Sequence, residues 1–358
     1  MIFSLLGLIP VILIYKGITI DLEFKRQLKI ILLLTVGVSI GLIYLFGYIA
    51  GFPGFLLFYP SHWMSFTIMM LVYCIFQFLI SLLFMKYREK IVIVSLFLFI
   101  GVTVFSIFNG FLLLNKHEIT LYSPKLPANF TEFKIVQVSD LHLGGLITPK
   151  QMHNAIQKIN ETNADLVVIT GDLVEGVNKP ETWKPFIPIL REIQSKYGTV
   201  AVCGNHDLVR GTDAFLDFTK ESHIRVLNNE SILLDNCIRI VGINDPSGIE
   251  YKIGGMDFDK AFRSVDKKEM TILLSHRPTY FEMAKKYGTD LMLSGHTHGG
   301  QIPFIDLLSR FTVDYLYGLY QEGSAYMYVS SGMSTTDSPI RLFTMNEIVV
   351  IKIKPTFS

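Results

Sequence analysis

Apolar residues are concentrated in the first third of the chain, where they form long runs rather than an alternating pattern. Four such runs can be delimited, at residues 1–15, 30–50, 64–85 and 91–114. The last three exceed the roughly 18 to 20 apolar residues that a helix needs to cross a hydrocarbon core about 30 Å thick. The first is shorter and contains Pro10, but it lacks the basic start and the small-residue cleavage site of a signal peptide. We therefore expect a transmembrane region of about four helices over residues 1–114.

Basic residues in the connections orient these helices. The loops after the first and third runs carry Lys and Arg, including Lys25, Arg26 and Arg88, whereas residues 55–62, between the second and third runs, contain neither. Cytoplasmic loops of membrane proteins carry an excess of basic residues. Four spans with these two loops in the cytoplasm place everything after Asn115 outside it. No Asp, Glu, Lys, Arg or His lies within any run, which favours an anchor over an ion or proton pathway.

The pattern changes after residue 114. Residues 115–131 contain Pro124 and Pro127 and are expected to form an extended linker. From residue 132 to residue 358, short apolar runs alternate with amphipathic helical segments, which predicts one layered α/β domain whose strands are covered on both faces. The expected strands are residues 133–138, 166–169, 199–202, 238–242, 271–274, 291–293 and 326–329, and the expected helices are residues 149–160, 181–196 and 278–287.

Composition and charge narrow the possible functions. The chain of 358 residues has 32 basic and 31 acidic residues, for a net charge of +1. Nucleic-acid binding that depends on a basic excess is therefore not expected. The three cysteines, Cys74, Cys203 and Cys237, have neither the spacing of metal ligands nor that of a disulfide framework.

Side chains that bind metals follow five of the expected strands. The motifs are Ser139-Asp140-Leu141-His142, Thr170-Gly171-Asp172, Gly204-Asn205-His206-Asp207, Ser275-His276-Arg277-Pro278 and Gly295-His296-Thr297-His298-Gly299-Gly300. In an open α/β sheet, the loops at the carboxyl ends of the strands converge on one crevice. We therefore expect a single site formed by Asp140, His142, Asp172, Asn205, His276, His296 and His298.

The chemistry of these side chains indicates a pair of metal ions. Carboxylate, amide and imidazole ligands suit divalent Mn, Fe or Zn, and ligand type alone does not select among them. Seven ligands are too many for one ion but suit two if one carboxylate bridges them. Two ions roughly 3.5 to 4 Å apart can clamp a phosphoryl group and activate a water molecule. The motifs that contain Asp140, Asp172 and His276 are by themselves typical of a turn, a helix cap or a surface loop. Gly-Asn-His-Asp and Gly-His-Thr-His-Gly-Gly are more specific, and the prediction depends on all five motifs occurring in order.

Taken together, the motifs resemble those of the calcineurin-like metallophosphoesterase family. They are most similar to a membrane-attached bacterial branch that carries Asp-Leu-His-Leu-Gly and Ser-Gly-His-Thr-His-Gly-Gly-Gln-Ile. The resemblance covers about residues 133–353 and shows no departure at the motif positions, while the membrane segments lie outside it. It implies a four-layer α/β/β/α sandwich.

The resemblance also implies a role for each site residue. It assigns Asp172 as the bridging ligand of two metals. It gives one metal the ligands Asp140, His142, Asp172 and His298, and the other the ligands Asp172, Asn205, His276 and His296. His206 would contact a phosphate oxygen or protonate the leaving group, and Asp207 would orient it.

These observations predict an integral-membrane, dinuclear-metal phosphoesterase with an extracytoplasmic catalytic domain. Attachment to a bilayer favours an envelope substrate: a lipid-linked phosphodiester or diphosphate, or a cell-wall polymer. A phosphomonoesterase or a nucleotide hydrolase is an alternative with the same chemistry. A non-catalytic membrane sensor of metal or phosphate is an alternative of another class, as is a transporter or scaffold with a regulatory domain. The complete ligand set favours the enzyme.

Two arginines and several aromatic residues near the motifs have two interpretations each. Arg277 and Arg341 are suited to bind a phosphate through two donors, or to form surface and structural pairs. The aromatic residues after the last motif either line an apolar groove beside the metals or pack against the sheet; they are Phe304, Phe311, Tyr315, Tyr317 and Tyr320.

Overall fold

The computed structural model describes residues 83–356 except 177–178, 210, 250–253, 302–310 and 337, together with scattered positions between residues 65 and 80. The chain divides into two compact units. The first unit comprises Met1–Leu113 with Gln301–Leu308 and Asp337–Phe343, and the second comprises the remainder from Leu114 onward.

The first unit contains one long apolar helix, α4 (Arg88–Leu112). Within it, Lys90–Leu112 is long and apolar enough to cross a membrane, and no other helix in the described part of the chain meets that test. Its side chains are largely uncovered, with Val94, Phe97 and Leu98 at least 66% exposed. This helix coincides with the fourth apolar run. The runs at residues 1–15 and 30–50 lie outside the described residues, and residues 64–85 are described only in part, so the four-helix bundle stays a prediction.

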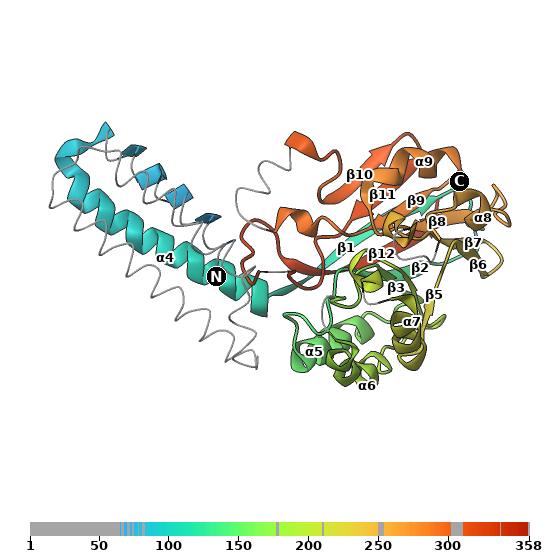
Figure 1. Ribbon diagram of the computed structural model, residues 1–358. Coiled ribbons are helices and arrows are strands. Elements are labelled where there is room, and N and C mark those ends of the chain that lie inside the picture. Colours follow the sequence, from blue (N-terminus) through green and yellow to red (C-terminus); the bar gives the residue numbers. More distant parts are fainter. Residues whose placement is uncertain are drawn as a thin grey trace. The chain divides into compact units, whose positions relative to one another are not determined.

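The second unit contains two six-stranded sheets (Figure 1). The first sheet has the order β1 (Leu114–Ser123), β12 (Asn346–Pro355), β2 (Phe133–Val138), β3 (Leu166–Thr170), β4 (Thr199–Val202) and β5 (Ile224–Val226). The second has the order β10 (Gly318–Glu322), β11 (Ala325–Val329), β9 (Leu291–Ser294), β8 (Met270–Leu274), β7 (Ile238–Gly242) and β6 (Glu230–Leu234). Strands β2 to β5 are parallel, as are β7, β8, β9 and β11.

Three apolar clusters define four layers. Because side chains alternate between the faces of a strand, Ile135 of β2 packs between the two sheets, whereas Val136 packs under the helices. The outer helices of the first sheet are α5 (Pro149–Asn160), α6 (Ile187–Leu190) and α7 (Thr212–Glu221), and those of the second are α8 (Phe258–Ala261) and α9 (Phe281–Lys286) (Figure 1). Strands such as β3 and β4 are buried along their whole length, as their unbroken apolar sequences predict.

Two segments differ from the expectations. The expected linker at residues 115–131 supplies most of β1, whose Leu114 lies opposite Asn346 and whose Ser123 lies opposite Pro355. Strand β1 therefore begins at Leu114, and only Leu113 separates it from the end of α4. The expected helix at residues 181–196 is instead two 3-10 turns followed by the four-residue α6. Pro185 and Pro188 lack the backbone N–H groups that a continuous helix requires in its interior.

Candidate metal centre

The five polar motifs follow β2, β3, β4, β8 and β9, so they come from both sheets. Backbone hydrogen bonds join the loops to one another: the N–H of Asp140 donates to Gly171, that of His142 to Asp172, and that of Gly295 to His276. A side-chain bond also links the sheets, because Gln137 of β2 donates to the carbonyl of Ser294 at 2.9 Å. The strand ends therefore place all seven expected ligands in one region of the second unit.

Most of these ligands have an unusual backbone conformation. Five of the seven have positive φ angles, between 46° and 72°: Asp140, His142, Asp172, His296 and His298. For non-glycine residues this region is sparsely populated, and such strain gathers at functional sites. The approach of the loops is also close, because a Cβ atom on Gly171 would collide with the imidazole of His276. Glycine is therefore required immediately before Asp172.

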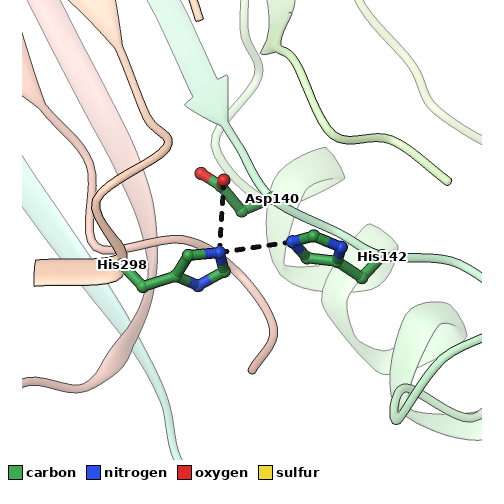
Figure 2. A group of neighbouring side chains, drawn as sticks. All are labelled: Asp140, His142 and His298. Carbon is green, nitrogen blue, oxygen red and sulfur yellow. Dashed lines mark hydrogen bonds and ion pairs between the residues drawn. The ribbon is translucent and has the colours of Figure 1, made fainter. Parts of the chain in front are cut away.

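The first group of converging atoms contains two imidazoles and a carboxylate. Nε2 of His142 lies 3.2 Å from Nε2 of His298, and the latter nitrogen lies 3.4 Å from Oδ1 of Asp140 (Figure 2). Oδ2 of Asp172 lies 3.8 Å from Nε2 of His142.

The second group shares that oxygen of Asp172. Oδ2 of Asp172 lies 3.2 Å from Nε2 of His276. The same nitrogen lies 3.2 Å from Oδ1 of Asn205 and 3.1 Å from Nδ1 of His296. One carboxylate oxygen is therefore next to both groups, where a bridging ligand would be.

Both groups fit a divalent ion. Two donors that each lie about 2.0 to 2.1 Å from one tetrahedral zinc ion are about 3.3 to 3.4 Å apart. The donor atoms of the two groups approach one another at 3.1 to 3.8 Å. The nitrogen and oxygen donors also match the preference of Zn, Fe and Mn for imidazole and carboxylate.

Burial and charge set the protonation of these side chains. Burial raises the pKa of Asp140. Burial acts in the same direction on Asp172, but its neighbouring histidines, His276 foremost, hold its pKa well below the usual value. Burial lowers the pKa of His276, yet the carboxylates of Asp172 and Asp140 raise it to about 10. Burial, with the positive charges of His276 and Arg277, lowers the pKa of His296 to about 3. In the metal-free site His296 is therefore neutral, which is the form that binds metals, whereas His276 carries the positive charge beside Asp172 that a bound cation would replace.

His206 lies beside the two groups and is held by Glu175. Its Nδ1 lies 2.8 Å from Oε1 of Glu175, while Oε2 of the same carboxylate lies 3.1 Å from Nδ1 of His142. The side chain of His206 is 25% exposed, whereas that of His142 is 1% exposed. Burial lowers the pKa of His206, but Glu175 and Asp172 raise it to about 9. Glu175 therefore connects an expected metal ligand to the expected proton donor.

Asp207 does not hold His206 as the resemblance implies. Its two oxygens accept the backbone N–H groups of Val174 at 2.9 Å and Gly204 at 2.8 Å. This buried carboxylate, whose pKa burial and the charge of Asp172 raise to about 7, joins the loops after β3 and β4. The contact with the His206 ring comes from Glu175 instead. Sequence reasoning missed Glu175, whose only local signal is its position three residues after Asp172.

The two arginines have different surroundings. Arg277 forms a two-point ion pair with Asp245, with Nε–Oδ2 and Nη2–Oδ1 distances of 2.7 and 3.3 Å. Its Nη1 lies 3.3 Å from Nε2 of His296, at the edge of the second group. Arg341 belongs to the first unit, where its backbone N–H donates to Ser106 of α4 at 3.1 Å.

The aromatic residues after the last motif also divide. Tyr315 and Tyr320 pack against the second sheet, with ring centroids 5.1 Å apart, as the packing interpretation expects. Tyr317 is 38% exposed and Phe311 is 82% exposed. Phe304 lies outside the described residues.

Comparisons with known proteins agree with this geometry. Residues 133–300 match the family described as calcineurin-like phosphoesterase. An uncharacterized metallophosphoesterase of Helicobacter pylori strain J99 is 34% identical over 240 residues, which cover 66% of this chain and 63% of that protein. One of Aquifex aeolicus is 33% identical over 245 residues, covering 67% of this chain and 92% of that protein. A Bos taurus protein named "transmembrane protein with metallophosphoesterase domain" is 29% identical over 239 residues, covering 63% and 53%. The chain therefore spans less than two thirds of the Helicobacter and Bos relatives.

Proposed function

Because the chain belongs to the calcineurin-like metallophosphoesterase family, we propose that it is a membrane-anchored hydrolase that cleaves a phosphodiester or diphosphate bond with two divalent metal ions. The observation that carries the proposal is the position of Asp172 Oδ2, which is next to both converging groups. In this proposal one ion is held by Asp140, His142, Asp172 and His298, and the other by Asp172, Asn205, His276 and His296.

When bound, the two ions would clamp the phosphoryl group, stabilise its developing charge and lower the pKa of the attacking water. The chain holds the ligands ready for this task. The N–H of His276 Nδ1 donates to the carbonyl of Thr170 at 2.9 Å, which leaves the lone pair of Nε2 directed at the second group. Glu175 does the same for His142 by accepting the Nδ1 proton. The backbone N–H of His296 donates to the carboxylate of Asp140.

His206 is proposed as the proton donor to the leaving oxygen. Its Nδ1 is bound by Glu175, so its Nε2 is the atom that remains for the substrate, and its ring is more exposed than those of the buried ligands. In hydrolysis the attacking water loses one proton to solvent and its oxygen bonds to phosphorus. The bond from phosphorus to the leaving oxygen breaks, and that oxygen takes the proton of His206, which solvent then replaces.

Arg277 is proposed to bind a phosphate oxygen. His296 directs Nδ1 at the second group, and an imidazole that binds a metal through Nδ1 carries its proton on Nε2. That nitrogen cannot then accept a hydrogen bond from Nη1 of Arg277, 3.3 Å away. Because Asp245 holds the rest of the guanidinium, Nη1 is left to donate to the substrate.

The membrane location and the substrate class are the parts of the proposal that depend on α4. Its uncovered apolar surface, and the transmembrane designation of the Bos taurus relative, support anchoring. Anchoring in a membrane favours a lipid-linked or envelope phosphoester as the substrate. We propose that the basic loops are cytoplasmic and the catalytic domain is extracytoplasmic. Reporter fusions after Asn115 test this topology, and cytoplasmic reporter activity there would overturn it.

Purified full-length protein loaded with Mn tests the chemistry. It is assayed on a matched phosphomonoester, a phosphodiester and a lipid diphosphate, with metal content measured in parallel. His206→Ala should lower turnover by about 10²- to 10⁴-fold while both metals remain bound. His153→Ala is the matched control, because His153 is a 43% exposed histidine of α5. Bound metal with no hydrolysis of any substrate would instead favour a non-catalytic sensor of metal or phosphate. Faster hydrolysis of the monoester than of the other substrates would favour a phosphomonoesterase.

A further inference from the structure

Glu347 is a buried carboxylate that belongs to neither group of converging ligands. It is the second residue of β12 and is 1% exposed. Its Oε1 accepts the backbone N–H of Ser331 at 2.9 Å. The hydroxyls of Tyr317 and Tyr328 both donate to its Oε2 at 3.1 Å. A buried carboxylate is unfavourable unless donors bind its oxygens. The three donors offset that cost and hold the carboxylate in one orientation.

Glu347 is joined to the turn after β11 by its backbone as well as by its side chain. Its own N–H donates to the carbonyl of Gly332 at 2.9 Å. The hydroxyl of Ser331 donates to the carbonyl of Met345, the residue before β12, at 2.7 Å. The turn formed by Ser331 and Gly332 is therefore held in place by the start of β12.

This turn lies directly against two expected ligands of the first group. Gly332 has a φ angle of 86°, and a Cβ atom at its position would lie 3.1 Å from Cβ of Asp140 and 3.3 Å from Nδ1 of His298. The N–H of Ser334 also donates to the carbonyl of Asp140 at 3.2 Å. Because the contact is this close, a displacement of the turn would change the position of both ligands.

The second group has supports that do not pass through this turn. The imidazole of His276 donates from Nδ1 to the carbonyl of Thr170 at the end of β3, at 2.9 Å. The carbonyl of His276 accepts the N–H of Gly295, which follows β9, at 2.9 Å. We therefore expect the position of the turn to affect the first group more than the second.

We infer that Glu347 is a positioning residue for the first metal ion, the ion proposed above to bind in the first group. By accepting the N–H of Ser331, its carboxylate holds the turn against Asp140 and His298. This inference rests on the two-metal centre of the proposed function and adds a residue that binds neither ion. Residues that orient metal ligands typically change metal affinity about 10- to 100-fold when they are replaced.

Two substitutions separate the position of the carboxylate from its charge. Glu347→Asp keeps the charge but withdraws the oxygens by about 1.5 Å, the length of one carbon–carbon bond, so the 2.9 Å bond to Ser331 is lost. Glu347→Gln removes the charge but keeps an oxygen for that N–H. Its NH₂ group can donate to the tyrosine hydroxyls, which also accept hydrogen bonds.

Stepwise binding of Co²⁺ to metal-free, purified full-length protein measures the effect. Calorimetry and visible absorption give the affinity of each ion, and native mass spectrometry gives the number bound. His298→Ala and His276→Ala identify the absorption of the first and second ion, because each removes a ligand of one group. Glu347→Asp should weaken the first ion about tenfold or more and the second much less. Glu347→Gln should bind both ions nearly as the wild type does.

Asp290→Ala is the matched control for a loss of stability alone. Asp290 accepts the N–H of Thr271 at 2.8 Å, and it precedes β9, whereas the metal-binding loop follows that strand. Denaturant titration of the metal-free proteins should show that Asp290→Ala and Glu347→Asp both lower stability. Only Glu347→Asp should weaken the first ion.

The inference is overturned if Glu347→Asp binds both ions as the wild type does, or weakens both equally. It is also overturned if Glu347→Gln weakens the first ion as much as Glu347→Asp does, because charge rather than position would then be responsible. If the wild type binds two Co²⁺ ions but hydrolyses no phosphoester, the proposed hydrolase function fails, while the titrations still decide the role of Glu347. A wild-type protein that binds no ion in the first group would overturn both.

Discussion

Replacing Glu175 with Gln tests whether this carboxylate positions the proton donor. Glu175 accepts from two imidazoles at once, His206 at 2.8 Å and His142 at 3.1 Å. A glutamine of the same shape has one acceptor oxygen and one NH₂ group, so one of the two rings loses its acceptor. A hydrogen bond to a charged group contributes about 1.5 to 3 kcal/mol, and the loss of a group that orients a metal ligand lowers metal affinity about 10- to 100-fold. We therefore expect kcat to fall about 10- to 100-fold at saturating metal, with a much smaller change in KM.

The assay measures kcat and KM on a soluble chromogenic phosphodiester, with metal content determined on the same samples. Glu192→Gln is the matched control, because Glu192 pairs with His153 at 3.1 Å in the same way but at the surface. The double variant Glu175→Gln with His206→Ala distinguishes a role of Glu175 in positioning the His206 ring from a role in packing alone. If Glu175 acts through His206, Glu175→Gln should have little further effect on kcat once His206 is removed. The positioning role would be refuted if Glu175→Gln kept the wild-type kcat. It would also be refuted if Glu175→Gln lowered kcat as much in the His206→Ala background as in the wild type.

Three further substitutions probe the bridge, the phosphate contact and the loop connection. Asp172→Asn removes the charge shared by both groups and should reduce bound metal from two ions to one or none by mass spectrometry; two retained ions would contradict a bridging role. Arg277→Gln should raise KM about tenfold with both metals bound, as expected for loss of a charge-assisted contact of about 1.5 kcal/mol; an unchanged KM would exclude substrate binding by Arg277. Asp207→Asn leaves one buried N–H, of Val174 or Gly204, without an acceptor and should lower the free energy of unfolding by about 1 to 3 kcal/mol, measured by denaturant titration with metal-free protein. An unchanged midpoint for Asp207→Asn would show that water or a backbone shift replaces the lost acceptor.

The parts of the fold that the sequence predicts correctly depend on short-range patterns. Strand β3 is an unbroken apolar run because both of its faces are covered, and helix α5 begins with the capping box of Thr148 and Gln151. The site motifs were found for the same reason, since each follows directly after such a strand. Strand β1, where the sequence predicts a linker, depends on a distant partner. Strand β1 mixes polar and apolar residues, and it pairs with β12, more than 200 residues away. Nothing within its own ten residues indicates that pairing.

Short-range sequence patterns also fail to predict which side chains of the site contact one another. The sequence shows which loops carry carboxylates, but the partner of each carboxylate depends on how the loops meet. Asp207, adjacent to His206 in the chain, binds the backbone of two loops. Glu175, more than 30 residues before His206, is the residue that contacts its ring. Adjacent side chains in a tight turn diverge, whereas residues from neighbouring loops can converge, so sequence proximity led to the wrong carboxylate.

The strained and charged character of the site argues that metal binding and folding are linked in this domain. Asp140 and Asp172 are almost fully buried, and buried carboxylates are unfavourable unless they are paired. Around them the ligand nitrogens converge to 3.1 and 3.2 Å, and five of the seven ligand residues have positive φ angles. The backbone bonds between loops hold this arrangement in place, while two divalent cations would offset the buried negative charge and occupy the points of convergence. The unfavourable features therefore lie where the bound ions would act, and the remaining core, built from the continuous apolar strands, supplies the stability that allows them.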